Sequence, residues 1–476
     1  MIEGLKPYAQ YTESGLTTIG MLPNHWQLLR AKTLFREIDD RSVTGKETLL
    51  SVSHISGVRR RSETNANMFL AKSNIGYKRC QPHDLIINTM WAWMGALGVS
   101  HLSGIVSPAY AVYRPLSGTA LLPGYVEHLL RAPAYVAEYT LRSSGIHSSR
   151  LRLYPEHFLR IPLAVPPTEE QAAIVRFLDH ANRRIDRFIR AKKRLIALLN
   201  ERKQAIIHRA VTRGLDMKLP MKDSGVPWLG EIPAHWEVSA LGRAVRIISG
   251  YPFPSQGFSS SDADTRLLRG INVTPRGVNW ESVVYWKRTA TDDLDGFSLK
   301  VGDIVIGMDR PIIASGTRVS IVHETDTPSL LLQRVCCIRP SNRLNAGYLY
   351  LLLSGHAFYK YIEPIFTGIS VPHLSPQQVR AFMFGFPPVE EQHAIVGSVQ
   401  AATAKIEAAV KRVQQETALL REYRTRLIAD VVTGQLDVRE AVKELPVEDE
   451  DGGKPVNAGD EIEESEIDDS EQDEAA

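Results

Sequence analysis

Two long stretches of the chain carry apolar residues every three or four positions, the spacing that lines one face of an α-helix. We expect the first helix to begin at Thr168, with Gln171 completing a capping box after two prolines, and to stop at Gly214. Lys192, Arg202 and Glu416 interrupt the apolar pattern. The apolar positions form a heptad seam at Ile174, Leu178, Ala181, Ile185, Phe188, Leu195, Leu199 and Ile206, and at Ile395, Val399, Ala402, Ile406, Ala409, Val413, Leu420, Tyr423 and Leu427.

A lone helix would leave this apolar stripe in water, so we expect the two helices to pack on each other. Antiparallel packing would place the segments that precede each helix at opposite ends of the pair. At about 1.5 Å per residue, some 40 residues would form a rod of roughly 60 Å.

The segments that precede the helices combine short apolar runs with turn residues, which indicates mixed α/β blocks. Residues 85–113 lack Asp, Glu, Lys and Arg, yet glycines, Asn88 and His101 divide them, which favours buried strands over a membrane helix. We expect helices around Gly124–Arg142 and Ala346–Tyr361 to close the blocks. The expected strands are Glu47–Val52, Leu85–Asn88, Ala109–Tyr113, Arg266–Ile271, Asp303–Ile306, Val319–Val322 and Val335–Ile338.

The chain is an internal duplication. SGLTTIGMLPNHW at 14–26 returns as SGVPWLGEIPAHW at 224–236, and PPTEEQAAIV at 166–175 returns as PPVEEQHAIV at 387–396, with eight of ten residues identical. Between these anchors the similarity fades to scattered matches, such as Asp84 with Asp303 and Arg114 with Arg339. Divergent blocks on a repeated frame indicate different ligands on equivalent scaffolds. We expect an α+β protein with domains at 1–167 and 217–388, spacer helices at 168–216 and 389–443, and a tail at 444–476.

The formal net charge of +2 conceals a partition of charge along the chain. Residues 444–476 hold 15 acidic residues and one lysine, which leaves 55 basic and 39 acidic residues, a net of +16, in 1–443. A tail rich in Glu and Asp and without aromatic residues is typical of a disordered segment. Such a tail can serve solubility, or it can compete with DNA phosphates for the basic surface of the body.

Composition also restricts the compartment and the chemistry. The start MIEGLKPYAQ has no apolar core, so we expect no secretory signal and a cytoplasmic protein without membrane contact. Cys80, Cys336 and Cys337 lack the spacing of a metal site and are expected to be reduced thiols. The sequence contains no Walker loop, no dinucleotide-binding glycine motif, no His-Glu-x-x-His and no cysteine pairs at zinc spacing. We therefore expect no catalytic residue, no metal and no cofactor in this chain.

The two Pro-Pro pairs are not the amino-methyltransferase motif, because the residues around them lack its acidic or amide and aromatic positions. A helix start after each block explains them better. The positive signal is instead a set of basic and aromatic residues beside predicted strands.

Arginine and asparagine can form bidentate hydrogen bonds to guanine and adenine edges in the major groove. For each single residue here, a solvated loop is the alternative interpretation. Trp91 and Trp93 can contact bases or sugars, although tryptophan more often packs in a core. The predicted DNA-contacting residues are Arg59, Arg60, Arg61, Trp91, Trp93, Arg269, Asn272, Arg276, Arg310, Arg334 and His373, the last in the loop 367–373.

The first long helix is more basic than the second. Residues 169–214 hold 12 Lys or Arg and five acidic residues, whereas residues 390–440 hold seven basic and eight acidic residues. The first helix therefore suits DNA phosphates or an acidic partner better than the second, with a generic exposed face as the alternative.

Together these features resemble the specificity subunit of a type I restriction-modification system. The resemblance covers nearly the whole chain except the acidic tail. It rests on the Gly-x-x-Pro-x-His-Trp openings that end at Trp26 and Trp236, the Pro-Pro-x-Glu-Glu-Gln elements at 166 and 387, and the stretches RLLRGINVTPRGV and LLQRVCCIRP. Their order, duplication and spacing make the match specific, although no single motif does.

The resemblance implies two target recognition domains held apart by an antiparallel coiled-coil pair of helices, each domain reading one half of a bipartite double-stranded DNA target. It implies a non-catalytic chain onto whose helices two methyltransferase subunits dock; those subunits bind S-adenosylmethionine and methylate adenine. Restriction subunits that use ATP and Mg would add DNA translocation and cleavage. The candidate docking residues are Glu170, Gln171, Arg187, Glu391, Gln392 and Arg424.

Two other classes remain open at this point. A standalone sequence-specific DNA-binding regulator would use the same basic surfaces, but it would not need a duplicated helix pair with polar breaks in its seam. A single-chain restriction or methylation enzyme would need a catalytic block, which the sequence motifs do not supply.

Overall fold

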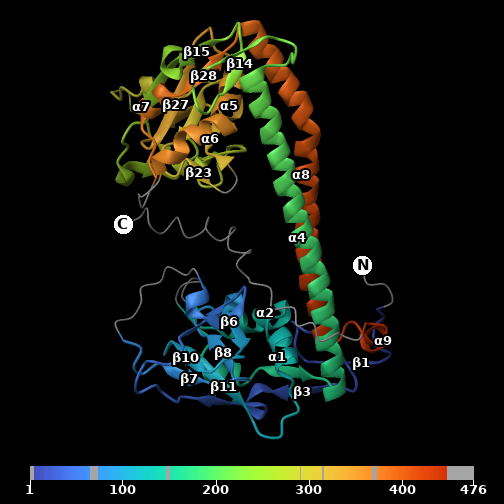
Figure 1. Cartoon of the computed structure of the whole chain (residues 1–476). Coiled ribbons are helices and arrows are strands. Elements are labelled where there is room, and N and C mark those ends of the chain that lie inside the picture. Colours follow the sequence, from blue (N-terminus) through green and yellow to red (C-terminus); the bar gives the residue numbers. More distant parts are fainter. Residues whose placement is uncertain are drawn as a thin grey trace. The chain divides into compact units, whose positions relative to one another are not determined.

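The computed structural model describes residues 5–64, 73–145, 151–289, 291–313, 316–366 and 372–446. The described residues form a mixed α+β protein with two long helices, as the sequence predicts (Figure 1). The chain divides into two compact units: unit 1 comprises residues 1–192 and 415–476, and unit 2 comprises residues 193–414. Each unit therefore contains one part of each long helix. Most of the predicted acidic tail, from residue 447 onward, lies outside the described residues.

Unit 1 is built around a four-stranded antiparallel sheet in the order β4-β11-β8-β9, formed by β4 (Phe35–Ile38), β11 (Tyr110–Pro115), β8 (Leu85–Asn88) and β9 (Leu97–Val99). Its buried strands β8 and β9 pack under α1 (Pro123–Leu130) and α2 (Pro133–Arg142), which supply Tyr125, Leu129 and Tyr135 to the core. The other elements are β1 (Tyr11–Glu13), β2 (Met21–Pro23), β3 (Gln27–Arg30), β5 (Leu50–Ser53), β6 (Gly57–Arg60), β7 (Lys78–Cys80), β10 (Gly104–Val106), α3 (Pro155–Phe158) and β12 (Pro162–Val165).

Unit 2 repeats this sheet with strands in the equivalent order β16-β27-β22-β25, formed by β16 (Val245–Ser249), β27 (Val335–Pro340), β22 (Ile304–Gly307) and β25 (Val319–Ile321). It adds a second four-stranded sheet, β17 (Phe258–Ser259), β21 (Val284–Trp286), β18 (Thr265–Leu268) and β26 (Ser329–Leu331), in which β18 and β26 run parallel. The other elements are β13 (Met221–Asp223), β14 (Glu231–Pro233), β15 (Glu237–Ala240), β19 (Val273–Thr274), β20 (Gly277–Val278), β23 (Ile312–Ile313), β24 (Gly316–Thr317), α5 (Ala346–Ser354), α6 (His356–Ile362), α7 (Pro376–Ala381) and β28 (Met383–Phe386).

The seven predicted strands overlap β5, β8, β11, β18, β22, β25 and β27. Each of the two predicted closing helices is divided in two. Pro133 begins α2 because its ring and missing N–H suit a first helical turn and not the middle of a helix. Gly355 separates α5 from α6 with an extended backbone.

The two long helices are α4 (Thr168–Arg213) and α8 (Val389–Val432), and a short helix α9 (Arg439–Lys443) follows. Gly214 ends α4 in the left-handed conformation, at a φ of 70°, as predicted. The predicted capping box is wrong, because the Gln171 side chain bonds to Ala120, Leu122 and the carbonyl of Pro166 instead.

Within unit 1, the first part of α4 runs antiparallel to the last part of α8. Asp186 accepts a hydrogen bond of 2.8 Å from Arg424, and Lys192 donates one of 2.6 Å to Glu416. The later residue of α4 thus pairs with the earlier residue of α8, as in an antiparallel pair. Two of the three polar breaks in the predicted seam, Lys192 and Glu416, thus form an ion pair. Within unit 2, Lys203 of α4 pairs with Glu407 of α8 at 2.6 Å.

In α4 the predicted seam is correct at its start and then slips by one residue. In α8 it fails at Ala402, and the later positions Ile406, Val413 and Leu427 are buried as predicted. Phe188 is 54% exposed and Ile189 is buried in its place; Ala402 is exposed and Thr403 is buried. A straight helix has 3.6 residues per turn, so its buried face drifts from a strict heptad after two or three turns. Leu195 is exposed for the same reason.

The end of each long helix completes the core of a globular part. Leu427, Val431 and Val432 of α8 belong to the unit 1 core, whereas Ile207 and Val211 of α4 belong to the unit 2 core. Buried tyrosines mark these junctions. The Tyr125 hydroxyl donates to the Ala164 carbonyl at 2.8 Å and the Tyr348 hydroxyl to that of Gly385 at 2.9 Å.

Candidate nucleic-acid interface

Three of the predicted DNA-contacting residues meet an aspartate at one place in unit 2, which we call the Asp309 cluster: Asp309, Arg310, Arg334 and His373. The Asp309 carboxylate lies 3.2 Å from a guanidinium nitrogen of Arg334 and 2.6 Å from Nδ1 of His373. Backbone bonds fix the three segments, since Met308 N–H donates to Arg334 O at 2.9 Å and Arg310 N–H donates to Pro372 O at 2.9 Å. Residues 367–371 of the same predicted loop lie outside the described residues.

The backbone of this cluster is unusual. Arg310 and Arg334 have positive φ values of 43° and 66°, and His83 is the one other non-glycine residue with positive φ among those described. Side chains other than Gly, Asn and Asp rarely adopt this region, and such residues concentrate at binding sites. Both arginines are exposed. The cluster therefore presents two cations from constrained turns.

The β19–β20 turn is joined to the Asp309 cluster by Arg318. Its guanidinium donates to the carbonyls of Gly270, Val273 at 3.2 Å and Asp309 at 3.1 Å. Arg276 lies at the tip of this turn and is exposed. The structure thus brings Arg276, Arg310, Arg334 and His373 into one region of unit 2.

Two predicted DNA contacts next to that turn serve the fold instead. Asn272 is 1% exposed; its side-chain oxygen accepts from Arg269 N–H, and its amide donates to the carbonyls of Asn279 and Ser282. The prediction that Asn272 contacts DNA is wrong, because no free donor or acceptor of the amide reaches the surface. Arg269 is half-buried and donates to Ser282 O at 2.9 Å, so part of its guanidinium also stabilises the loop.

In unit 1, the predicted arginines lie on the β5–β6 hairpin and the turn after it. Arg60 is exposed and lies 3.5 Å from Glu63, whereas Arg59 and Arg61 are half-buried. Arg131, which caps the C-terminal end of α1, fixes the tip of the hairpin by donating to the carbonyls of His54 and Ile55 at 2.6 and 2.7 Å. The hairpin is therefore held rigidly on α1.

Trp91 and Trp93 stack on each other between β8 and β9, with ring centroids 6.2 Å apart and planes at 15°. Trp91 is 49% exposed, so the alternative that it packs in the core is wrong. The Trp93 ring nitrogen donates to Met90 O at 3.0 Å. The exposed Trp91 ring, stacked on the half-buried Trp93, offers a flat apolar face to a base or sugar.

Comparison with known proteins, like the geometry, indicates a similarity to proteins that recognise DNA. Residues 250–415 match the family described as "Type I restriction modification DNA specificity domain". The specificity subunit of the Escherichia coli type I restriction enzyme EcoAI is 34% identical over 181 residues, which are 38% of this chain and 30% of that subunit. The resemblance to type I specificity subunits is confirmed.

A second curated relative and a solved structure extend the comparison. The MjaVIII specificity subunit of Methanocaldococcus jannaschii is 28% identical over 283 residues, 59% of this chain and 64% of that subunit. The chain thus aligns with less than two thirds of either curated subunit. A solved structure titled "Structural basis underlying complex assembly and conformational transition of the type I R-M system" has a TM-score of 0.56 at 16% identity, and the match covers 86% of this chain and 98% of that chain. This likeness shows the shared fold.

Three of the six predicted docking residues are buried. Glu170 and Gln171 are buried, and Glu170 accepts from Trp26 Nε1 at 3.0 Å and contacts His25 at 2.8 Å. Gln392 is buried, and Glu391 contacts His235 at 2.8 Å. The docking prediction is wrong for Glu170, Gln171 and Gln392, because these side chains join each helix start to its own globular part.

The remaining docking candidates differ in availability. Arg424 is half-buried and bonded to Asp186, whereas Arg187 is exposed. The sequence analysis missed a different set, the large apolar side chains that the long helices leave exposed: Phe188, Leu195, Leu198 and Leu419. The one-residue slip of the seam is the signal that could have found Phe188 and Leu195.

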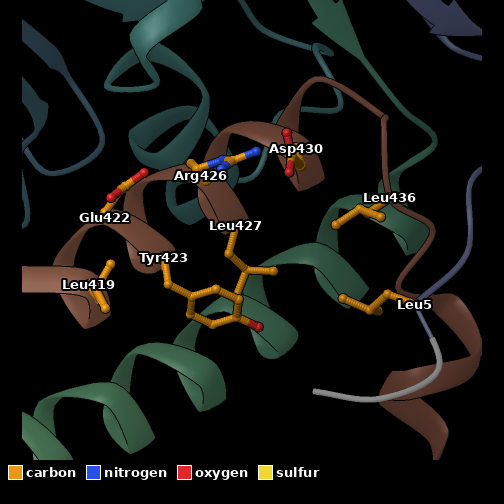
Figure 2. A pocket seen from close by; sticks show the side chains of 8 residues that line it. All are labelled: Leu5, Leu419, Glu422, Tyr423, Arg426, Leu427, Asp430 and Leu436. Atoms are coloured by element: carbon orange, nitrogen blue, oxygen red, sulfur yellow. The ribbon is translucent and has the colours of Figure 1, made fainter. Parts of the chain in front are cut away.

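One exposed apolar residue, Leu419, also lines a groove of unit 1 with a volume of about 430 Å³. Figure 2 shows Tyr423 and Leu427 projecting from the same helix face beside it. Burial raises the pKa of Asp430 at the end of the groove. The lining residues are Leu5, Leu419, Glu422, Tyr423, Arg426, Leu427, Asp430 and Leu436.

The three cysteines are free and buried. Burial raises the pKa of the Cys80 thiol to about 11 and that of Cys336 to about 12, and it also raises the pKa of Cys337. All three are therefore protonated, unreactive thiols at neutral pH. Among the described helices, none is both long and apolar enough to cross a bilayer.

Proposed function

We propose that the chain is the DNA-sequence specificity subunit of a type I restriction-modification complex. Residues 1–167 and 217–388 act as two target recognition domains, each reading one half of a bipartite double-stranded DNA target. One observation carries this proposal: the two units share a sheet order and buried frame, yet present different side chains at their surfaces. A repeated scaffold with divergent surfaces suits two different half-sites.

In the second domain, the DNA-reading surface is the Asp309 cluster with the β19–β20 turn. Arg276, Arg310 and Arg334 supply exposed guanidinium groups, which can bond bidentately to guanine O6 and N7 or hold phosphates. Asp309 orients Arg334 and His373 before DNA arrives, so less side-chain freedom is lost on binding.

In the first domain, we propose that Arg60 and Arg61 contact DNA and that Trp91 and Trp93 stack on a base or sugar. Arg60 ends β6, Arg61 begins the short helical turn that follows it, and the two stacked tryptophans lie between β8 and β9. The two domains therefore use different chemistry, which supports recognition of two different half-sites.

We also propose that α4 and α8 form the antiparallel coiled-coil spacer between the domains, and that two methyltransferase subunits dock on it. The support is the set of exposed apolar side chains Phe188, Leu195, Leu198 and Leu419, which a helix pair without a partner would leave in water. Arg187 lies beside Phe188 on the same exposed stretch.

This chain contributes recognition and assembly, and catalysis belongs to its partners. The methyltransferase subunits supply S-adenosylmethionine and adenine methylation, and restriction subunits, joined through them, supply ATP- and Mg-dependent translocation and cleavage. The complex acts on cellular DNA in the cytoplasm. A standalone DNA-binding regulator accounts less well for the apolar residues on the long helices.

A domain exchange tests this proposal. Residues 217–386 are replaced by the equivalent segment of a relative with a different target, and the complex with the cognate methyltransferase is purified and its methylated motif determined. We expect one half of the motif to change and the other to stay. A change in both halves would contradict modular reading, and failure to co-purify with the methyltransferase would favour the standalone regulator.

A further inference from the structure

The chain leaves the described structure beside the first turns of α4. A guanidinium nitrogen of Arg176 donates to the carbonyls of both Leu445 and Pro446, at 3.2 Å each. Val442, one turn earlier, is buried, and Leu445 packs against the core of unit 1. Leu445 and Pro446, the residues that directly precede the acidic segment 447–476, are therefore held against α4 beside a cationic side chain.

A basic stripe continues along α4 from that point. Arg187 and Arg190 follow Arg176 by 11 and 14 positions, which at 3.6 residues per turn places all three on one side of the helix. Arg187 and Arg190 are exposed, and Arg184 is exposed on the flank of the stripe. We call these residues, Arg176, Arg184, Arg187 and Arg190, the Arg187 stripe.

The acidic residues of this part of α4 do not neutralise the stripe, because they have other partners. Asp186 binds Arg424 of α8 at 2.8 Å, and Asp179 lies 3.5 Å from His128 of α1. The stripe therefore keeps a net positive charge within unit 1. Such a row of guanidinium groups attracts a polyanion and repels cations.

We propose that the acidic segment 447–476 binds to the Arg187 stripe and screens it from other polyanions. The segment contains 14 acidic residues and one lysine, so its charge complements the stripe. Its length also fits. Arg187 lies about 17 Å along the helix from Arg176 at about 1.5 Å per residue, and five extended residues after Pro446 span a similar length at about 3.4 Å each.

Two acidic runs of the segment are within reach of the Arg187 stripe, given the distances above. Residues 448–451 are all acidic and can reach Arg184 and Arg187, while the run that starts at Asp460 can cover the rest of the stripe. Bound in this way, the segment makes the basic helix available only to a ligand that displaces it. Non-specific DNA competes poorly for a surface that is already covered by its own chain.

The test places a fluorescent dye on the segment in the full chain, at Ser465→Cys. The native cysteines are buried, with thiol pKa values raised by burial, so a maleimide reacts at the introduced site. Dye anisotropy is measured as salt rises from about 0.05 M to about 1 M, over which the Debye length falls to about 3 Å. We expect high anisotropy at low salt and a clear fall at high salt.

Charge reversal identifies the binding surface. Arg187→Glu with Arg190→Glu should give low anisotropy at all salt concentrations, whereas Arg187→Lys with Arg190→Lys should behave like the parent. The matched control is Lys218→Glu with Lys222→Glu, which changes the charge equally at exposed positions of unit 2 and should leave anisotropy unchanged. Neutralising residues 448–451 with amides should lower anisotropy without altering the helix. Parent-like anisotropy in both the reversed and the neutralised variants would overturn the docking.

Screening is tested with random duplex DNA at one fixed salt concentration. Deleting residues 447–476 should tighten binding at least threefold in the parent, and the gain should disappear when Arg187 and Arg190 are glutamates. Equal affinity with and without the segment would overturn the screening role and leave solubility as its function.

Discussion

Arg339 holds Asp303 through two hydrogen bonds of 2.7 Å each, although Asp303 is only 2% exposed. Arg114 holds the buried Asp84 in unit 1 in the same way, at 2.8 Å for both bonds. In each case a backbone N–H three residues before the aspartate also donates to the carboxylate. The same bidentate pair thus ties a central strand, β22 or β8, to its neighbour β27 or β11.

This relationship predicts a large stability loss from a small change. Asp303→Asn leaves Arg339 without its counter-charge in a largely buried site, and should lower the free energy of unfolding of unit 2 by about 3 kcal/mol. Urea unfolding of the full chain measures it. The control is Arg288→Ala, which breaks the exposed pair with Asp295 and should cost less than about 1 kcal/mol. Equal effects of the two variants would contradict a structural role for the buried pair.

Asn272 and Arg276 are four residues apart, and they should respond in opposite ways to substitution. Asn272→Ala removes the amide that closes the loop and should lower the free energy of unfolding by about 1–3 kcal/mol, with the bases read unchanged. Arg276→Ala should leave stability unchanged and weaken DNA binding. Thermal unfolding and DNA titration of both variants separate these roles. If Asn272→Ala changed the recognised motif, Asn272 would contact DNA after all and this account of the residue would be wrong.

Arg334 and Arg310 should contribute to DNA affinity through the Asp309 cluster. If Arg334 reads a guanine, Arg334→Ala costs about 1–3 kcal/mol on the cognate half-site and relaxes specificity at one position. A phosphate contact would instead weaken all sequences equally and reduce the salt slope by about 1. Lys222→Ala removes an exposed charge elsewhere on unit 2 and should change neither. Wild-type affinity and motif in Arg334→Ala would remove the cluster from the interface.

The cysteines give a prediction about pH. Burial raises the pKa of Cys80 to about 11 and that of Cys336 to about 12, so both stay protonated in the folded chain at pH 7–9. Maleimide should therefore modify the native protein slowly in this range and modify three thiols after denaturation. Because a raised thiol pKa favours the protonated folded state, this contribution to stability is complete below about pH 9 and is lost as pH rises toward the folded values. Rapid stoichiometric labelling of the native chain would contradict the buried placement.

The repeated parts of the fold were well predicted from the sequence. Both units bury the same kinds of strands and helix ends, so the same apolar and glycine positions recur in both copies. Apolar runs located β8, β22 and β27, and the left-handed glycine after Arg213 ended the first helix. The scattered match of Asp84 with Asp303 and of Arg114 with Arg339 corresponds to one buried ion pair in each unit. These residues recur because each ion pair joins two strands of the sheet that both units share.

The site was predictable only in part, because residue type does not reveal exposure. Asn272 and Arg276 both have the chemistry of base contacts, yet only the structure shows that the Asn272 amide is used inside the loop. Glu170 and Gln392 look like free polar residues at helix starts but bind their own domains. The Asp309 cluster joins segments that are far apart in the sequence, at 309, 334 and 373, and no spacing rule links them.

Co-expression with the genomically adjacent methyltransferase in a methylation-free host tests the central claim most directly. DNA from that host is sequenced at single-molecule resolution to detect modified adenines, with each protein expressed alone as the control. The account predicts a bipartite adenine-methylated motif that appears only when both chains are present. A soluble complex of both chains that leaves no such motif would contradict it.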